Sequence, residues 1–258
     1  MAAGAAGSDT SRTVDDLAAL LNGAGKRSRL ESLTTLRKAG FTYQPQLVVP
    51  LDVDLSCKDS DARSVITGMR TVDWEYALFF GQPLQKECDD TGCVVGAREI
   101  IPPSLTQAEW EQLQKSPGSL QSRELLVRRS LAFQRKLLEE ARREPAVLTA
   151  LGARQYGATL EILYISSILV LAAEESDSMP ELRKLHMNTF EQQGKILEVL
   201  LRDKSLGAHA YFRERAELVS SVLRLLRGKH RLPRAKELAQ VLEIIQPERD
   251  RYLAPCPR

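Results

Sequence analysis

The sequence predicts a mainly α-helical protein: an antiparallel bundle of about five helices, preceded by a smaller, irregular α+β N-terminal region. Three observations support this fold class. Residues 156–173 are apolar all the way round a helical wheel, and residues 119–247 carry helical periodicity almost without interruption. Residues 13–118 instead mix short helical patterns with extended chain that prolines interrupt.

The all-apolar segment 156–173 has two possible settings, because such a helix is either the centre of a core or a membrane span. A span needs ~20 predominantly apolar residues, whereas this segment contains Thr159, Glu161, Ser166 and Ser167. A carboxylate inside a bilayer costs at least ~2.5 kcal/mol, and no Lys or Arg cluster follows the segment. We therefore expect a buried central helix and no membrane span.

The composition limits the function classes to consider. The chain has 258 residues, 43% hydrophobic and 27% charged, which suffices for one large domain or two small ones. A net charge of only +2 does not imply attraction of the whole molecule to nucleic acid or membrane, so any such binding would need a local patch. Four cysteines are too few for a disulfide scaffold, and the N-terminus lacks the apolar run of a secretory signal. We expect an intracellular protein, cytoplasmic by default, with an organelle left open.

The N-terminal part is expected to begin with a flexible tail at residues 1–12. Short helices follow within 14–21 and 29–39, because capping residues precede and glycines end each apolar pattern. Residues 41–56 alternate in polarity but contain Pro45 and Pro50, so they are expected to be extended chain or an edge strand.

The rest of the N-terminal region is expected to hold a hairpin near 84–97 and a short helix. The turn-forming sequence Asp-Asp-Thr-Gly at 89–92 predicts the hairpin. Ser104 or Thr106 can cap the helix over 107–115, which Pro117-Gly118 would end.

Five longer helices are predicted within the bundle, residues 119–247. Their apolar residues recur three and four apart, and prolines or glycines separate them. The short connections predict antiparallel neighbours. Pro145 and Pro233 each suit the first turn of a helix, and Pro247 is expected to end the last one. Residues 248–258 are then a C-terminal tail, expected to become ordered only against another partner.

Two sequence patterns resemble ligand sites without meeting their requirements. Residues 22–28, Asn-Gly-Ala-Gly-Lys-Arg-Ser, contain half of a phosphate loop, but Leu20 and Arg27 stand where that motif needs Gly and Ser or Thr. Cys88 and Cys93 have a spacing that zinc sites use, yet no second ligand pair is near in sequence. They are reduced thiols, a local disulfide or metal ligands, and their spacing alone does not decide.

Buried polar atoms near Glu161 and Tyr164 are expected either to line a pocket in the bundle or simply to pair with an arginine such as Arg154. No Ser-His-Asp or Cys-His arrangement follows from spacing. We therefore nominate no catalytic residue, no metal ligand and no cofactor.

The most biased segment is 224–236, which joins the last two predicted helices. It contains six cations and no acid: Arg224, Arg227, Lys229, Arg231, Arg234 and Lys236. Such a basic corner can bind phosphates or an acidic partner, although it lacks the stacking aromatics of nucleic-acid readers. Cations there also favour the dipole at the helix C-terminus.

Two functions follow as hypotheses. The first is a non-enzymatic structural or adaptor subunit of a larger assembly, which binds other proteins through the bundle and the extended segment. The alternative is a nucleic-acid-associated protein that binds phosphates through the basic corner.

Overall fold

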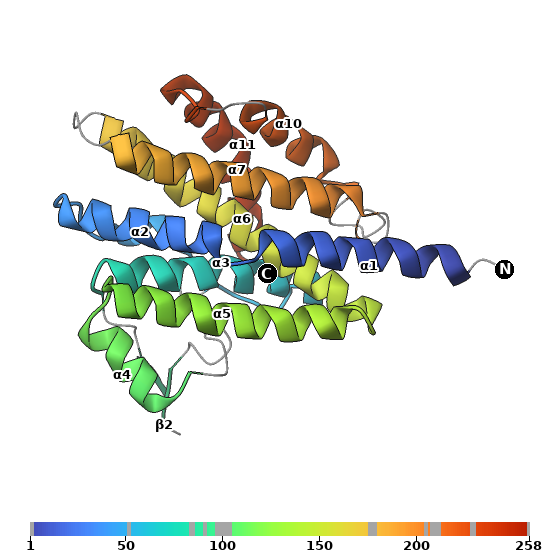
Figure 1. The fold of residues 1–258 in the computed structure, drawn as a ribbon, viewed down its shortest axis with the longest axis horizontal. Coiled ribbons are helices and arrows are strands. Elements are labelled where there is room, and N and C mark those ends of the chain that lie inside the picture. The colour runs from blue at the N-terminus through green and yellow to red at the C-terminus, as the bar shows by residue number, and fades with distance from the viewer. Residues whose placement is uncertain are drawn as a thin grey trace.

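The computed structural model describes residues 3–50, 53–82, 86–89, 92–95, 105–174, 180–203, 206, 213–227 and 231–256. This part of the chain is mainly helical and forms a bundle (Figure 1), as the sequence predicts. Its elements in chain order are α1 (Ala3–Leu20), α2 (Ala24–Lys38), the 3₁₀ turn η1 (Pro45–Leu47), α3 (Ser60–Phe79), β1 (Lys86–Asp89), β2 (Gly92–Val95), α4 (Gln107–Lys115), α5 (Leu120–Ala141), α6 (Pro145–Glu174), α7 (Pro180–Arg202), α10 (Ala216–Leu226) and α11 (Ala235–Leu253).

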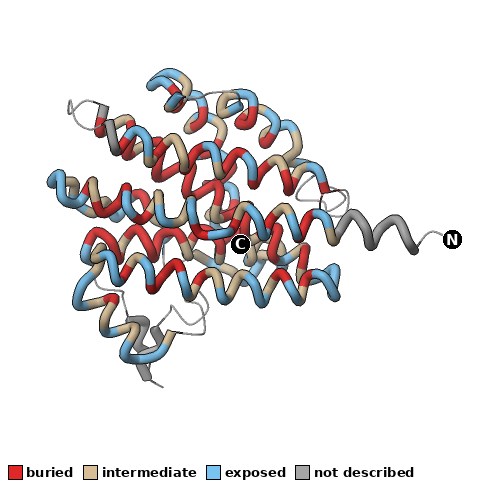
Figure 2. Tube along the Cα trace, viewed as in Figure 1, coloured by how far each residue is buried: buried red, intermediate tan, exposed pale blue. Residues whose placement is uncertain are grey.

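Helix α6 is the central element, which confirms the expectation for residues 156–173. It begins at Pro145, whose fixed φ suits a first helical turn. In Figure 1 it crosses the view diagonally behind α7, α2 and α1, and it packs against α3, α5, α7 and α11. In Figure 2 much of α6 is red, the colour of buried residues, because neighbouring helices cover it on all its sides. Leu160, Leu163 and Ile165 are each at most 3% exposed.

Helices α3 and α6 make the most extensive contact in the bundle, and two glycines allow their close approach. A Cβ added at Gly157 would lie 1.9 Å from the carbonyl oxygen of Val65, and one at Gly68 would lie 2.0 Å from that of Arg154. Only glycine fits at such distances from a rigid backbone, so α3 and α6 form one closely packed pair.

The N-terminal helices belong to the bundle, which corrects the expected division of the chain near residue 119. Leu17 of α1, Leu30 of α2 and Phe79 of α3 are fully buried in the same core cluster as α6 and α11. The prediction also treats residues 1–12 as a flexible tail, whereas α1 begins at Ala3. Alanine has the highest helix propensity, and this segment is rich in it.

Strands contribute little to the fold. Within the range 84–97, β1 and β2 pair antiparallel with Cys88 opposite Cys93, and they form a two-stranded ribbon. This ribbon adds no sheet layer, so the N-terminal region is not an α+β unit. Nothing in the described backbone decides among the three states expected for the two cysteines.

The segment 41–56 forms η1 and irregular chain where an extended or edge strand was expected; residues 51–52 lie outside the described part. Two backbone N–H groups of this segment donate to side chains and not to a neighbouring strand. The Val49 N–H donates to Asp73 Oδ2 at 2.9 Å, and the Gln44 N–H donates to the Tyr76 hydroxyl at 3.3 Å. Because these partners lie on α3, the segment is bound across the bundle surface.

Helix α11 continues through Pro247 to Leu253, so the predicted end at Pro247 is wrong. Proline removes one helical N–H donor, but the turns that follow remain packed on the core. Glu248, Arg249 and Tyr252 are all buried, at 3%, 5% and 8% exposure. Their contacts with α6 therefore outweigh the missing hydrogen bond.

The C-terminal tail expected at 248–258 is also corrected, because its described part binds the chain itself. Cys256 forms a disulfide with Cys57, 199 residues earlier, with the two Cα atoms 5.7 Å apart. The Lys58 ammonium donates to the Ala254 carbonyl oxygen at 2.9 Å. The segment just before α3 therefore anchors the end of the chain.

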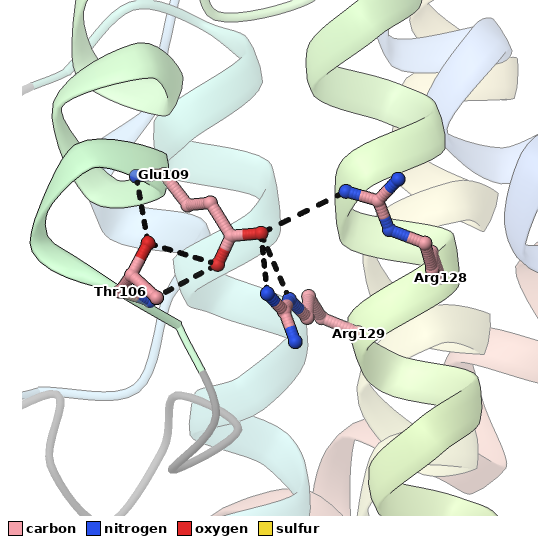
Figure 3. A network of polar contacts seen from close by, with 4 residues as sticks. All are labelled: Thr106, Glu109, Arg128 and Arg129. Atoms are coloured by element: carbon pink, nitrogen blue, oxygen red, sulfur yellow. Dashed lines mark hydrogen bonds and ion pairs between the residues drawn. The ribbon is translucent and has the colours of Figure 1, made fainter.

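Helix α4 stands away from the main body of the bundle and joins α5 through the contacts in Figure 3. Thr106 and Glu109 form a capping box at its first turn. The same carboxylate accepts from Arg129 Nη2 at 2.6 Å and lies 3.7 Å from Arg128, and the hydrogen bonds from Arg129 help to hold the pKa of Glu109 below its ordinary value. Trp110 also stacks on Trp74 of α3, with ring centroids 6.2 Å apart. These contacts fix α4 on the bundle.

Candidate functional site

A cavity of about 110 Å³ with both polar and apolar walls lies among α2, α3, α5, α6 and α7. Four charged side chains line it: Lys26, Arg29, Glu75 and Arg154. We call these four residues and their cavity the cation-rich cavity. Apolar side chains such as Phe133, Leu137 and Ile162 also line it, together with uncharged polar side chains: Thr71, Ser130, Gln134, Gln155, Gln192 and Gln193. Such a concave site with convergent polar groups is the usual form of a small-molecule site.

Lys26 and Arg29 both bind the Glu75 carboxylate, one at each oxygen. They project from the first turns of α2, and Glu75 projects from α3. The Glu75 side chain is only 1% exposed, and Lys26 also donates to the Ser130 hydroxyl of α5 at 2.8 Å. This small network therefore links three helices.

Arg154 of α6 adds a third cation that has no carboxylate partner among the described residues. Its guanidinium donates to the Thr71 hydroxyl at 3.2 Å and lies 5.1 Å from the centre of the Phe133 ring. A cation over an aromatic face is stabilised by the ring quadrupole, but its charge is not neutralised. The cavity therefore holds three cations and one carboxylate.

The titration of these groups reflects their burial and their charges. Burial lowers the pKa of Lys26, although the Glu75 charge opposes this effect. Burial would raise the pKa of Glu75, but the charges of Arg29 and Lys26 outweigh it and hold that pKa below its ordinary value. Burial also lowers the pKa of Arg154. Burial therefore disfavours the charged forms of Lys26 and Arg154, whereas the two paired cations favour the ionised form of Glu75.

Two glutamines of α7 form another wall of the cavity. Gln193 accepts from the Thr159 hydroxyl at 2.9 Å. Gln192 donates to the Leu20 carbonyl at 2.8 Å, and its carboxamide oxygen lies 1.3 Å from where a Cβ at Gly25 would be. Glycine at position 25 is thus what allows this carboxamide to reach the start of α2.

A second buried charge cluster lies on the other side of α3 and contains Asp73, Glu161 and Arg249. We call it the Glu161–Arg249 cluster. Arg249 donates from Nε and Nη2 to the two Glu161 oxygens at 2.7 and 2.9 Å, and from Nη2 to the Leu47 carbonyl at 3.0 Å. Its guanidinium also lies 4.4 Å from the centre of the Tyr164 ring. Glu161 therefore pairs with Arg249 of α11, not with Arg154 as expected.

Asp73 completes this cluster without adding a second negative charge. Burial and the nearby Glu161 charge raise the pKa of Asp73 well above its ordinary value, which favours the protonated acid. With Arg249 paired to Glu161, the Glu161–Arg249 cluster is neutral overall. We interpret it as a structural contact that fixes α11 against α3 and α6.

The predicted basic corner, residues 224–236, does not present all its cations freely. Arg227 donates to Glu198 at 2.7 Å, and Arg231 donates to Glu237 at 3.1 Å. Each ion pair neutralises one of the charges that phosphate binding would use. The acids come from α7 and from the first turn of α11, so spacing within 224–236 could not reveal them.

The other members of the basic corner differ in their setting. Arg224, Arg234 and Lys236 are exposed at the surface. Lys229 lies outside the described residues. The structure thus places these exposed cations near the end of α10 and the start of α11.

Three other observations bear on the function. No group of three or more His, Cys, Asp or Glu residues that could hold a metal gathers in the described part of the chain. One helix, over residues 145–173, is long and apolar enough to cross a membrane, and 78% of its apolar window is buried within the protein. Comparison with protein-family models, curated proteins and solved structures finds no match.

Sequence reasoning missed the cation-rich cavity, since its charges come from α2, α3 and α6. Gly25 and Lys26 fall in the half-matched phosphate-loop pattern of residues 22–28, and the structure places both in the first turn of α2. Glu75 lies two residues from Asp73, and Arg154 precedes Gln155, so neither stands out in the sequence as an isolated charge.

Proposed function

We propose that the protein is a non-enzymatic adaptor or structural subunit that binds another protein of a larger assembly. The observation that carries this proposal is a groove between the end of α2 and the start of α5. Its lining includes Arg37, Lys38, Pro117, Leu120 and Arg123. Leu120 is 65% exposed and is the one large hydrophobic side chain that the described surface exposes to this extent.

The chemistry of this groove favours an acidic partner segment with an apolar side chain. Three cations surround one exposed leucine, and Arg37 and Lys38 are both exposed. Glu31 is the acid nearest to Arg123, at 3.9 Å. Complementary charge at the rim gives such a contact its specificity, and a buried apolar anchor gives affinity.

The rigidity of the bundle also supports an adaptor role. Buried ion pairs link α2 to α3 and α6 to α11, and the Cys57–Cys256 disulfide closes the chain on itself. A binding surface on a rigid body loses little conformational entropy when a partner docks. The groove lies on two helices of this body.

The test is native affinity purification of the tagged chain from its source cells, followed by identification of bound proteins and of the assembly's size. We expect a stoichiometric partner that carries an acidic segment. Leu120→Asp or Lys38→Glu should abolish the contact, whereas Lys195→Glu on the exposed face of α7 should preserve it. A monomer that binds nothing, or a partner retained by both groove variants, would overturn the proposal.

The alternative of nucleic-acid binding rests on the exposed Arg224, Arg234 and Lys236. It is the weaker proposal, because Glu198 and Glu237 already pair with Arg227 and Arg231. RNA or DNA binding at two salt concentrations tests it. The alternative requires binding that falls steeply with salt and disappears when the three exposed cations become Ala.

The disulfide also bears on the proposed location. Disulfides persist in oxidising compartments and are rare in the cytosol, so the Cys57–Cys256 bond supports an oxidising compartment over the cytoplasmic default. Thiol labelling of the chain immediately after cell lysis tests this proposal. Labelling of Cys57 and Cys256 without prior reduction would favour the cytoplasm.

A further inference from the structure

We propose that the cation-rich cavity binds a small oxyanion of phosphate size, as a free ion or as the head group of a small molecule. This site is separate from the groove at Leu120 and does not depend on the adaptor function. It would make the rigidity of the bundle responsive to a ligand.

The residues that line the cavity carry more positive than negative charge. Lys26, Arg29 and Arg154 line the cavity with Glu75 as the one carboxylate in its lining. Burying a charge is costly unless an opposite charge compensates it, and Glu75 can compensate only one of three. An oxyanion of two negative charges would neutralise the remainder, and one of a single charge would halve it. The Glu161–Arg249 cluster lacks such an excess, so buried charge alone does not define the site.

Two residues that line the cavity have buried hydrogen-bond donors without a partner in the described chain. Arg29 uses one terminal nitrogen for Glu75, while its buried Nη1 has no partner among the described residues. The indole Nε1 of Trp74, a residue that also lines the cavity, is likewise buried without a partner in the described chain. Buried donors are usually satisfied, and the oxygens of a phosphate or sulfate ion are suitable acceptors for them.

Helix α2 has its N-terminal end at the cavity. The cavity is lined by Gly25 and Lys26, which lie in the first turn of this 15-residue helix. No acidic side chain occupies that turn, and the N-cap Gly23 offers no capping side chain. The Asn22 side chain accepts from the Ala24 N–H at 3.0 Å, and it is uncharged, so the positive end of the helix dipole adds to the cations at the same place.

The size of the cavity selects small ligands. Its volume of about 110 Å³ is well below the ~300–1,000 Å³ of pockets that hold drug-sized molecules. The walls formed by Gln155, Gln192 and Gln193 offer amide groups, which suit oxygen atoms of a ligand. The cavity thus favours a compact, polar anion over a bulky or apolar molecule.

The test is thermal unfolding and titration calorimetry of the full chain with inorganic phosphate, sulfate and a simple phosphomonoester, each against chloride at equal ionic strength. Binding to the folded state raises the unfolding temperature in a saturable way. We expect this rise with phosphate or sulfate but not with chloride. A larger rise with the phosphomonoester would identify a head group as the ligand; an equal or smaller one would identify the free ion.

Variants locate the effect. Arg154→Gln should weaken anion binding about 10- to 100-fold, because it removes a charged donor, and Arg154→Lys should restore part of it. Gly25→Ala should also weaken binding, since its Cβ forces the Gln192 carboxamide out of position. Lys195→Gln, an exposed cation of α7, should leave binding unchanged. If Arg154→Gln fails to fold, Gly25→Ala and the calorimetry of the wild type remain decisive.

Two results would overturn the proposal: no saturable stabilisation by any of the three anions, or stabilisation that both Arg154→Gln and Gly25→Ala retain. Leu120→Asp separates this site from the groove, since it should abolish the protein partner and leave anion binding intact. Failure of the adaptor function therefore does not imply failure of the anion site, and the reverse also holds.

Discussion

Two groups of buried charges lie on opposite sides of the same helix, and they differ in their balance. Asp73 and Glu75 are two residues apart on α3, so they face different neighbours. Asp73 belongs to the Glu161–Arg249 cluster, in which one arginine meets one carboxylate and a raised pKa favours the protonated form of the remaining acid. Glu75 belongs to the cation-rich cavity, in which Lys26 and Arg29 share it.

The difference separates a structural charge cluster from a candidate binding site. In the Glu161–Arg249 cluster the charges of Arg249 and Glu161 are paired with each other. In the cation-rich cavity the protein supplies more cations than carboxylates and leaves a volume of about 110 Å³. Removal of a cation should therefore lower the free energy of unfolding strongly in the Glu161–Arg249 cluster and only slightly in the cation-rich cavity.

The largest expected effect is the loss of Arg249. Arg249→Met leaves the Glu161 carboxylate buried without a partner, so we expect the free energy of unfolding to fall by about 3–5 kcal/mol. Arg154→Met in the cation-rich cavity relieves repulsion among cations, and in anion-free buffer it should cost less than about 1 kcal/mol. Urea unfolding of both variants measures the contrast. Equal losses for the two variants would contradict the distinction between the regions.

The same contrast explains how much of the fold the sequence could predict. The central helix was predictable because its apolar residues cover every face, and its start was predictable from Pro145. The course of α11 beyond Pro247 was not, because local proline rules favour an end there. The deciding interaction joins Arg249 to Glu161, 88 residues away.

The candidate site was less predictable than the fold. Each of its charges looks ordinary in its own segment: Lys26 follows glycines, Glu75 follows Trp74, and Arg154 lies near the start of an apolar helix. Their meeting depends on the close packing of α3 and α6 at Gly68 and Gly157, which no periodicity reports. The basic corner, conversely, is conspicuous in sequence, yet acids from elsewhere neutralise part of it.

Breaking the Cys57–Cys256 disulfide tests how much it adds to the anchoring of α11 by the Glu161–Arg249 cluster. Reduction of Cys57–Cys256, or Cys57→Ser, frees a loop of 199 residues and releases the segment that follows α11. Native disulfides typically contribute about 2–4 kcal/mol by limiting the unfolded chain, so we expect a loss of that size in denaturant unfolding. Anion binding by the cation-rich cavity should not change. A reduced protein of unchanged stability would show that Arg249 alone anchors α11.

Glycine substitutions test the close contact of α3 and α6, the two helices that contribute residues to both regions. Gly157→Ala places a Cβ 1.9 Å from the Val65 carbonyl oxygen, so α3 and α6 must separate, and we expect a loss of about 1–3 kcal/mol. Gly194→Ala on α7 is the matched control, because its Cβ would meet nothing nearer than 3.9 Å. Alanine there should stabilise the helix by about 0.5–1 kcal/mol. Thermal unfolding of the pair gives opposite shifts if the close contact of α3 and α6 is required.

The smallest expected effect concerns a buried group that adds charge only when the pH falls. His186 of α7 lies against Ser32 of α2, with its Nε2 3.0 Å from the hydroxyl, and burial lowers its pKa from 6.5 to about 4. The unfolded chain then binds the proton more tightly, so this contribution to stability is complete above pH 6.5 and is lost as the pH falls towards 4. Between about pH 7 and pH 5.5 the loss should be about 1 kcal/mol.

His186→Gln measures this contribution by difference. Burial raises the pKa of Asp73 and Glu161, so these acids act in the opposite direction and gain stability as the pH falls. They do so equally in both proteins, and the wild type minus the variant therefore isolates the histidine. We expect the stability of the wild type to fall more steeply with acid than that of the variant. Parallel pH profiles would mean that His186 is protonated in the folded protein without cost.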